Sequence, residues 1–171
     1  RVVLIFQPAE ETGEGAIAYR SDPKFAEIPP DMVLSLHNLP GLAMGAVSLP
    51  TGPANCASRG ARIALFGRTS HAAAPQDGVS PAPVLAQLMQ DLATLGAGGD
   101  LDEDYALTTV THAKLGEPTF GVAPGKAELW VTLRTVTDEK MQSLSDALVS
   151  KVATLAADYG LRHEITYHDV F

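Results

Sequence analysis

Two adjacent carboxylates, Glu10 and Glu11, follow directly on an apolar run near the start of the sequence. Neighbouring side chains in an extended segment point in opposite directions. One carboxylate could therefore bind a cation while the other acts as a general base on water held by that cation. His37 follows a second apolar run in the same way. With one carboxylate as the base, the other carboxylate and His37 form a Glu/His half of a metal site. Catalytic zinc takes three protein ligands and an open position, so this set is incomplete. An exposed acidic loop and a hydrogen-bonded structural histidine explain the same residues.

The two apolar runs, at 2–6 and 32–36, predict the strands that position these side chains. Unbroken β-branched and apolar residues are typical of a sheet covered on both faces. Small residues between the runs predict a helix, and the resulting βαβ unit brings the carboxyl ends of both strands to one edge. Ligands of open α/β sheets bind beyond that edge. The sequence therefore predicts that Glu10, Glu11 and His37 lie near one another.

A different pattern begins at about residue 59, where strands and helices follow the order β-α-β-β-α-β. Apolar residues recur at intervals of three and four in the predicted helices and alternate with polar residues in the later strands. The predicted strands are 61–67, 105–115, 126–135 and 161–171, and the predicted helices are 80–96 and 137–160. This order is that of the ferredoxin-like α+β fold, in which both helices cover one face of a four-stranded antiparallel sheet.

His71 and Arg134 are the candidate functional residues of this second part. His71 lies in a loop of small residues after the first strand and is free to face a cavity. The alternation of strand 126–135 places Arg134 on the sheet face that the helices leave open, where its guanidinium could bind a carboxylate through two hydrogen bonds. Ordinary surface positions explain both residues equally well. The other histidines read as structural or exposed: His112, His163 and His168.

Composition excludes several classes of function. The net charge is −8 and the 12 Lys and Arg residues are scattered, which argues against a nucleic-acid partner. No apolar run approaches the roughly 20 residues of a membrane span, and no leader precedes the first run, so we expect a cytoplasmic protein. The one cysteine, Cys56, forms no internal disulfide and reads as a small buried residue. Because Arg1 begins inside a predicted buried strand, we interpret the chain as a piece of a longer polypeptide.

Four blocks of the sequence together resemble the zinc-dependent aminoacylase and carboxypeptidase family, and most of all its hippurate hydrolase and indoleacetyl-amino-acid hydrolase branch. In chain order the blocks are LIFQPAEETGEGA, LSLHNLPGLAMGAVSLPTGPA, GRTSHAAAPQDGVSPAPVLAQL and PTFGVAPGKAELWVTLRT. They keep the order and the gaps of the family across the whole chain. No single block is specific by itself, and the resemblance rests on their agreement.

The resemblance implies a role for each candidate in the first part of the chain. Glu10 corresponds to the general base that activates metal-bound water, and Glu11 to a metal ligand. His37 corresponds to a second ligand, in the place of an aspartate in other branches. The implied cofactor is a divalent metal, zinc or else manganese, cobalt or nickel, with up to two ions in a complete site. Residues 1–56 would be part of the family's α/β catalytic domain, and 57–171 its ferredoxin-like lid, through which a homodimer forms.

The resemblance also implies the substrate and the roles of the lid residues. The substrate would be a small N-acyl amino acid or peptide. His71 would reach the active site of the partner subunit and stabilise the oxyanion of the tetrahedral intermediate, and Arg134 would hold the free carboxylate of the substrate. Gly121 stands where the family usually has an asparagine, which removes one polar contact to the substrate. The family's other metal ligands have no counterpart in this sequence, so we expect the isolated chain to be inactive.

Two other functions stay open at this point. The first is a non-catalytic dimerisation or ligand-binding module that kept the fold and lost the chemistry, and Gly121 mildly favours it. The second is a cysteine hydrolase that uses Cys56 and His71, although nothing in the sequence around Cys56 would activate a thiol. The joint presence of Glu10, Glu11 and His71 with His37 favours the metal-dependent hydrolase.

Overall fold

The computed structural model describes residues 1–38, 40–49, 51–52 and 55–170, except for the side chain of Glu11. The chain separates into two compact units, Arg1–Ala54 and Asn55–Phe171. Within the described ranges no helix is both long enough and apolar enough to cross a lipid bilayer.

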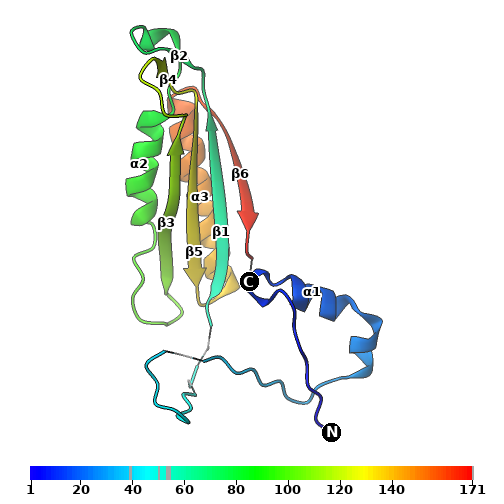
Figure 1. Ribbon diagram of the computed structural model, residues 1–171. Coiled ribbons are helices and arrows are strands. Elements are labelled where there is room, and N and C mark those ends of the chain that lie inside the picture. The colour runs from blue at the N-terminus through cyan, green and yellow to red at the C-terminus, as the bar shows by residue number, and fades with distance from the viewer. Residues whose placement is uncertain (39, 50, 53–54, 171) are drawn as a thin grey trace. The chain divides into compact units, whose positions relative to one another are not determined.

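The second unit is a four-stranded antiparallel sheet with two helices on one face (Figure 1). Its strands lie in the order β3-β5-β1-β6. This order and the βαββαβ sequence of elements confirm the predicted ferredoxin-like fold. The elements are β1 (Ala57–Phe66), α2 (Ala82–Ala93), β3 (Ala106–Leu115), β5 (Lys126–Thr135), α3 (Asp138–Asp158) and β6 (Arg162–His168).

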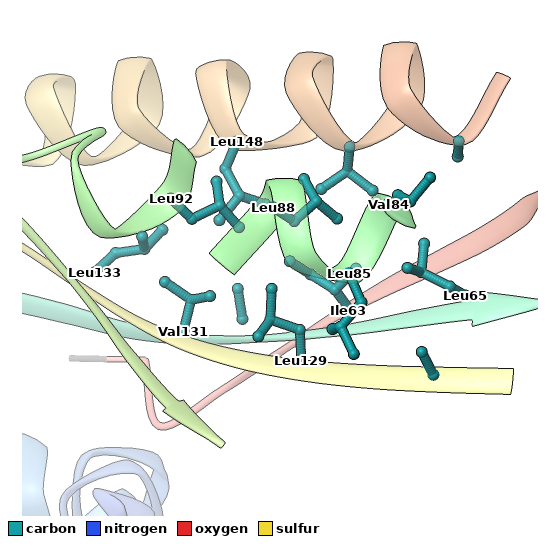
Figure 2. Close-up of a cluster of buried hydrophobic side chains, with 14 of the residues drawn as sticks. Ile63, Leu65, Val84, Leu85, Leu88, Leu92, Leu129, Val131, Leu133 and Leu148 are labelled. Atoms are coloured by element: carbon teal, nitrogen blue, oxygen red, sulfur yellow. The ribbon is translucent and has the colours of Figure 1, made fainter. Parts of the chain in front are cut away.

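A single apolar layer between the sheet and the helices holds this unit together (Figure 2). Alternate residues of each strand point toward α2 and α3. Each helix packs a stripe of apolar residues, spaced by three and four, against them. Its fully buried members include Ile63, Leu65, Leu88, Leu92, Leu129, Val131, Leu133, Leu148 and Val152. The inward face predicted for strand 126–135 is confirmed, and the opposite face of the sheet is left uncovered by the helices.

Local signals set the ends of α3. The side chain of Thr137 accepts a hydrogen bond from the backbone N–H of Lys140 at 3.2 Å and so caps the first turn. Gly160, with φ of 65°, follows the last turn in the left-handed region that suits glycine. Both ends agree with the predicted helix.

A small two-stranded sheet projects from one end of the main sheet (Figure 1). It consists of β2 (Ser70–His71) and β4 (Val122–Ala123), and the 3-10 turn η3 (Pro75–Asp77) follows β2. We call residues 68–78 together with 119–125 the His71 module. The sequence predicted loops here and no strands.

The strands predicted at 2–6 and 32–36 do not form in the first unit. Both segments lack regular structure, and their side chains are exposed, as in Val2 at 90% and Leu34 at 84%. An apolar run becomes a strand only when a neighbouring backbone pairs with its N–H and C=O groups, and no described residue of this unit supplies one. The helix predicted between them is present as α1 (Glu14–Ser21), flanked by the 3-10 turns η1 (Glu10–Thr12) and η2 (Pro23–Glu27).

Candidate functional site

His71 lies at the end of β2 with its ring exposed to solvent. It is directly opposite Val122 of β4, and the next pair is joined by a hydrogen bond from the N–H of Ala72 to the carbonyl of Gly121 at 3.0 Å. Nδ1 of His71 accepts a hydrogen bond from the backbone N–H of Ala73 at 3.1 Å. A nitrogen that accepts carries no proton, so the neutral ring carries its proton on Nε2. His71 therefore presents an N–H donor outward without needing a positive charge.

Two glycines hold the His71 module against the main sheet. Gly67 donates its N–H to the carbonyl of Gly125 at 2.8 Å, and Arg68 and Val79 exchange a pair of backbone hydrogen bonds. A Cβ on Gly67 would lie 2.0 Å from the carbonyl oxygen of Val79, and one on Gly125 would lie 2.5 Å from the amide nitrogen of Thr69. Only glycine allows backbones to approach this closely. The module is thus fixed by tight backbone packing.

Arg134 lies on the open face of the sheet, as predicted, and its side chain is exposed. The strand register places it between Leu107 of β3 and Ser58 of β1. Within the part of the chain that the structure describes, its guanidinium takes part in no ion pair or side-chain hydrogen bond. This cation is available for a ligand.

His71 belongs to the small β2-β4 sheet, whereas Arg134 is the second-to-last residue of β5 in the main sheet. The His71 module adjoins the end where β5 begins, whereas Arg134 comes eight residues after Lys126, the first residue of that strand. At the rise of a β-strand, eight residues span about 27 Å. The structure therefore does not bring these two predicted site residues together within one chain.

A cluster of aromatic and charged side chains occupies the middle of the open face. The Arg62 and Glu128 side chains form an ion pair of 2.5 Å, and Nε1 of Trp130 donates to the other Glu128 oxygen at 2.5 Å. The His112 ring lies 5.2 Å from that of Trp130. The hydrogen bond from Arg62, and after it the one from Trp130, holds the pKa of the Glu128 carboxyl below its ordinary value, although partial burial opposes the shift.

Sequence reasoning missed this cluster. The alternation of strand 126–135 placed Trp130 on the open face, but its neighbours on other strands follow from the register, which pairs it with Arg62 and His112. An open hollow of about 1180 Å³ lies beside the cluster, at the end of the sheet that carries the His71 module. Its lining includes Lys114, Lys126 and Glu128 but neither His71 nor Arg134.

The candidates of the first unit do not form a metal site in the described part of the chain. Glu10 lies in η1 and is exposed, and the Glu11 side chain is outside the described residues. His37 is exposed, and its Nδ1 lies 2.9 Å from the carbonyl oxygen of Asn38. A carbonyl only accepts, so Nδ1 donates and Nε2 keeps its lone pair, as in a metal-ligating histidine. Nevertheless, no described group of three His, Cys, Asp or Glu side chains could hold an ion.

Cys56 is a half-buried free thiol directly before β1. Because Ala57 pairs with Thr135, Cys56 lies at the end of the sheet that carries Arg134. It is therefore at the other end from His71, and the two cannot act as a nucleophile and its base within one chain.

Comparison with known proteins agrees with this architecture. Residues 54–160 match the peptidase dimerisation domain M20_dimer. The chain is 30% identical over 98% of its length to the N-acetyl-L-cysteine deacetylase of Bacillus subtilis strain 168, and covers 40% of that protein. It is 27% identical over 99% of its length to the N-acetyldiaminopimelate deacetylase of Anoxybacillus flavithermus, and covers 45% of it. The chain thus spans less than half the length of these curated relatives.

A solved structure shows the same fold. The hydantoinase/carbamoylase family amidase from Burkholderia ambifaria superposes with a TM-score of 0.58 at 22% identity, over 66% of this chain and 28% of the amidase chain. The matched share of this chain is about that of the ferredoxin-like unit, and at this identity the likeness concerns the fold alone. Since the dimerisation-domain match covers well over half of the sequence, the chain belongs to the M20 peptidase family, whose dimerisation domain it carries.

Proposed function

We propose that this chain is part of a homodimeric amidohydrolase that cleaves the amide bond of N-acyl amino acids or small peptides. Each active site would use residues from both copies. The observation that carries the proposal is the placement of two exposed residues that each suit a part of such a substrate. His71 lies on the small β2-β4 sheet next to the end where β5 begins, and Arg134 lies near the end of β5.

The chemistry of the two residues fits the two ends of an N-acyl amino acid. The outward Nε2–H of His71 is a donor for the oxyanion that develops on the scissile carbonyl. The guanidinium of Arg134, which has no ion-pair partner among the described residues, is a partner for the free carboxylate. The scissile carbonyl and the carboxylate of one amino acid are only about 4 Å apart. Since about 27 Å of strand lies between Arg134 and the start of β5, next to the His71 module, the two side chains serve one substrate only if they come from different copies of the chain.

In the first unit we assign Glu10 as the general base that takes a proton from the attacking water and delivers it to the leaving nitrogen. Glu11 and His37 are assigned as ligands of a divalent metal, with zinc as the first choice. Such an ion supplies, when bound, a polarised carbonyl and an acidified water. The spacing of these residues in the sequence and the Nδ1 bond of His37 support the assignment. The described donors are an incomplete set, so the remaining ligands belong to the rest of the whole protein.

The substrate class rests on the relatives. Two of them are named as deacetylases of N-acetyl-L-cysteine and N-acetyldiaminopimelate, which are both N-acyl amino acids. The four sequence blocks favour the hippurate hydrolase branch in particular, with a larger acyl group. A panel of N-acyl amino acids that differ in the acyl group distinguishes these possibilities.

The test uses the whole protein from which this chain derives, with a divalent metal added. Wild type is expected to hydrolyse at least one member of the panel, and Glu10→Gln to lose about a hundredfold or more in kcat with its metal content unchanged. The isolated 171-residue chain is the negative control. Equal turnover of the Glu10→Gln variant and wild type would refute the role of Glu10 as the base.

A non-catalytic dimerisation module is the second candidate, because Gly121 lacks the polar side chain that the family usually has at this place. In that case the whole protein would dimerise and bind ligands, but it would hydrolyse no member of the panel under any metal condition.

A further inference from the structure

The side chain of Phe120 contacts almost nothing in the described chain. It is 105% exposed, although it is a large apolar ring beside the strand pair that carries His71. A fully exposed phenylalanine on an ordered loop is unusual, because burial of such a ring is favourable wherever a partner surface exists. Its exposure indicates that the ring makes its contacts with another molecule, and only when that molecule is bound.

The backbone on the C-terminal side of Phe120 is well anchored. The N–H of Gly121 is hydrogen-bonded to Oγ1 of Thr119 at 3.2 Å, and the carbonyl of Gly121 accepts from Ala72 at 3.0 Å. The next two residues form β4. The ring is thus presented on a fixed backbone, so that little conformational entropy is lost when it meets a ligand.

The same strand pair ties Phe120 to His71. Val122, two residues after Phe120, is directly opposite His71 and is 48% exposed. Directly opposed side chains of an antiparallel pair lie on the same face, so Val122 flanks the imidazole. Whatever molecule accepts the hydrogen bond of His71 therefore meets Val122 at once. Phe120 lies two residues before Val122 on the loop that leads into β4, which is at most about 7 Å of chain away.

We infer that Phe120, together with Val122, contacts the acyl group of the substrate and sets the enzyme's preference for acyl size. This inference rests on the proposed function. The amino-acid half of the substrate carries the carboxylate that Arg134 binds, so the apolar acyl half is left for the apolar side chains next to His71. A Cβ built on Gly121 meets no atom within 4 Å, so space beside the ring is open for an acyl group larger than acetyl.

The experiment compares Phe120→Ala and the conservative Phe120→Leu with wild type in the whole protein. The substrates share one amino acid and carry an acetyl, an octanoyl or a benzoyl group. We expect Phe120→Ala to lower kcat/KM for the octanoyl and benzoyl substrates by about tenfold, mainly through KM, with the acetyl substrate changed less than about twofold. Phe120→Leu is expected to recover most of the octanoyl activity.

Tyr159→Ala is the matched control, because Tyr159 is also an exposed aromatic residue but follows α3 in the helical layer. It should leave all three substrates unchanged. Thermal unfolding and the dimer mass are measured for every variant, so that misfolding is recognised and Phe120→Leu then replaces Phe120→Ala.

His71→Ala separates a failure of this inference from a failure of the proposed function. If His71→Ala lowers kcat for every substrate while Phe120→Ala affects all acyl groups equally or not at all, the role of Phe120 is wrong and the hydrolase proposal stands. If wild type hydrolyses none of the substrates, the proposed function fails and the inference falls with it.

Discussion

The backbone amide of Ala73 donates a hydrogen bond to Nδ1 of His71 and so fixes the tautomer of this exposed ring. We predict that neutral His71 carries its proton on Nε2, which ¹⁵N chemical shifts of the labelled protein measure directly. In this tautomer the Nε2–H is free to donate to the substrate. A ring protonated on Nδ1 would contradict the proposed role.

Mixed dimers test whether each active site draws on two copies. His71→Ala and Arg134→Ala are each expected to be nearly inactive in the whole protein. In a dimer of one variant with the other, one of the two sites contains both an intact His71 and an intact Arg134 if these come from different subunits. Random mixing makes half of the dimers mixed, so about one quarter of the wild-type activity returns.

The control for this experiment is a mixture of two separately prepared His71→Ala proteins, which can regenerate no intact site. If His71 and Arg134 served the same site from one chain, every site of the mixed dimer would carry one defect. Activity would then stay at the level of the single variants, and the shared-site arrangement would be wrong.

Gly67→Ala tests the attachment of the His71 module. The added Cβ would lie 2.0 Å from the carbonyl oxygen of Val79, so the two backbones must separate. We expect a loss of about 2 kcal/mol or more in the free energy of unfolding, measured by urea denaturation, and lower activity through displacement of His71. Gly121→Ala, within the His71 module itself, is the matched control, because a Cβ there meets no atom within 4 Å. Equal stability of the Gly67→Ala variant and wild type would show that the backbones can separate at no cost.

Gly121→Asn introduces the side chain that the family resemblance implies at this place. It should fold as well as wild type, since the position is open. An amide beside His71 supplies a polar contact to the substrate, so we expect KM for N-acyl amino acids to fall. An unchanged KM would mean that Gly121 is not near the bound substrate.

The Arg62–Glu128 ion pair makes stability depend on pH in a defined direction. The pKa of Glu128 is lower in the folded chain than in the unfolded chain, chiefly through the hydrogen bond from Arg62, so its stabilising effect is present at neutral pH and is lost as the pH falls through that lowered pKa. Glu128→Gln should reduce Tm at pH 7 by no more than about 2 °C, because the pair is partly solvated. The difference from wild type should begin to shrink near the ordinary pKa of a glutamate, about 4.3, and disappear below the lowered pKa of Glu128.

Glu164→Gln is the control for this prediction. Its partner Arg162 belongs to the same strand, and the Glu164 side chain is 59% exposed, compared with 24% for Glu128. We expect a smaller change in Tm for Glu164→Gln at pH 7. A Tm difference for Glu128→Gln that grows toward acid pH would have the wrong sign and would exclude the ion pair as its cause.

The sequence alone was sufficient for the order of elements in the second unit and for the faces of its strands. Periods of two and 3.6 residues are local properties, so the sequence predicts the ferredoxin-like order, the inward face of β5 and the open position of Arg134 without knowledge of neighbours. The family resemblance, which is confirmed over residues 54–160, also came from motifs that are local in the chain.

Pairing between distant segments decided the rest. The runs 2–6 and 32–36 have the composition of strands but no described backbone partner, so they remain irregular. The neighbours of Trp130 follow from the strand register, and the separation of His71 from Arg134 follows from the pairing of β2 with β4 in a small sheet of its own. Residue types and periodicity determine which way a side chain points along its own strand. Which other side chains it can meet, and whether one chain or two supply a site, depends on long-range backbone pairing that only the tertiary structure shows.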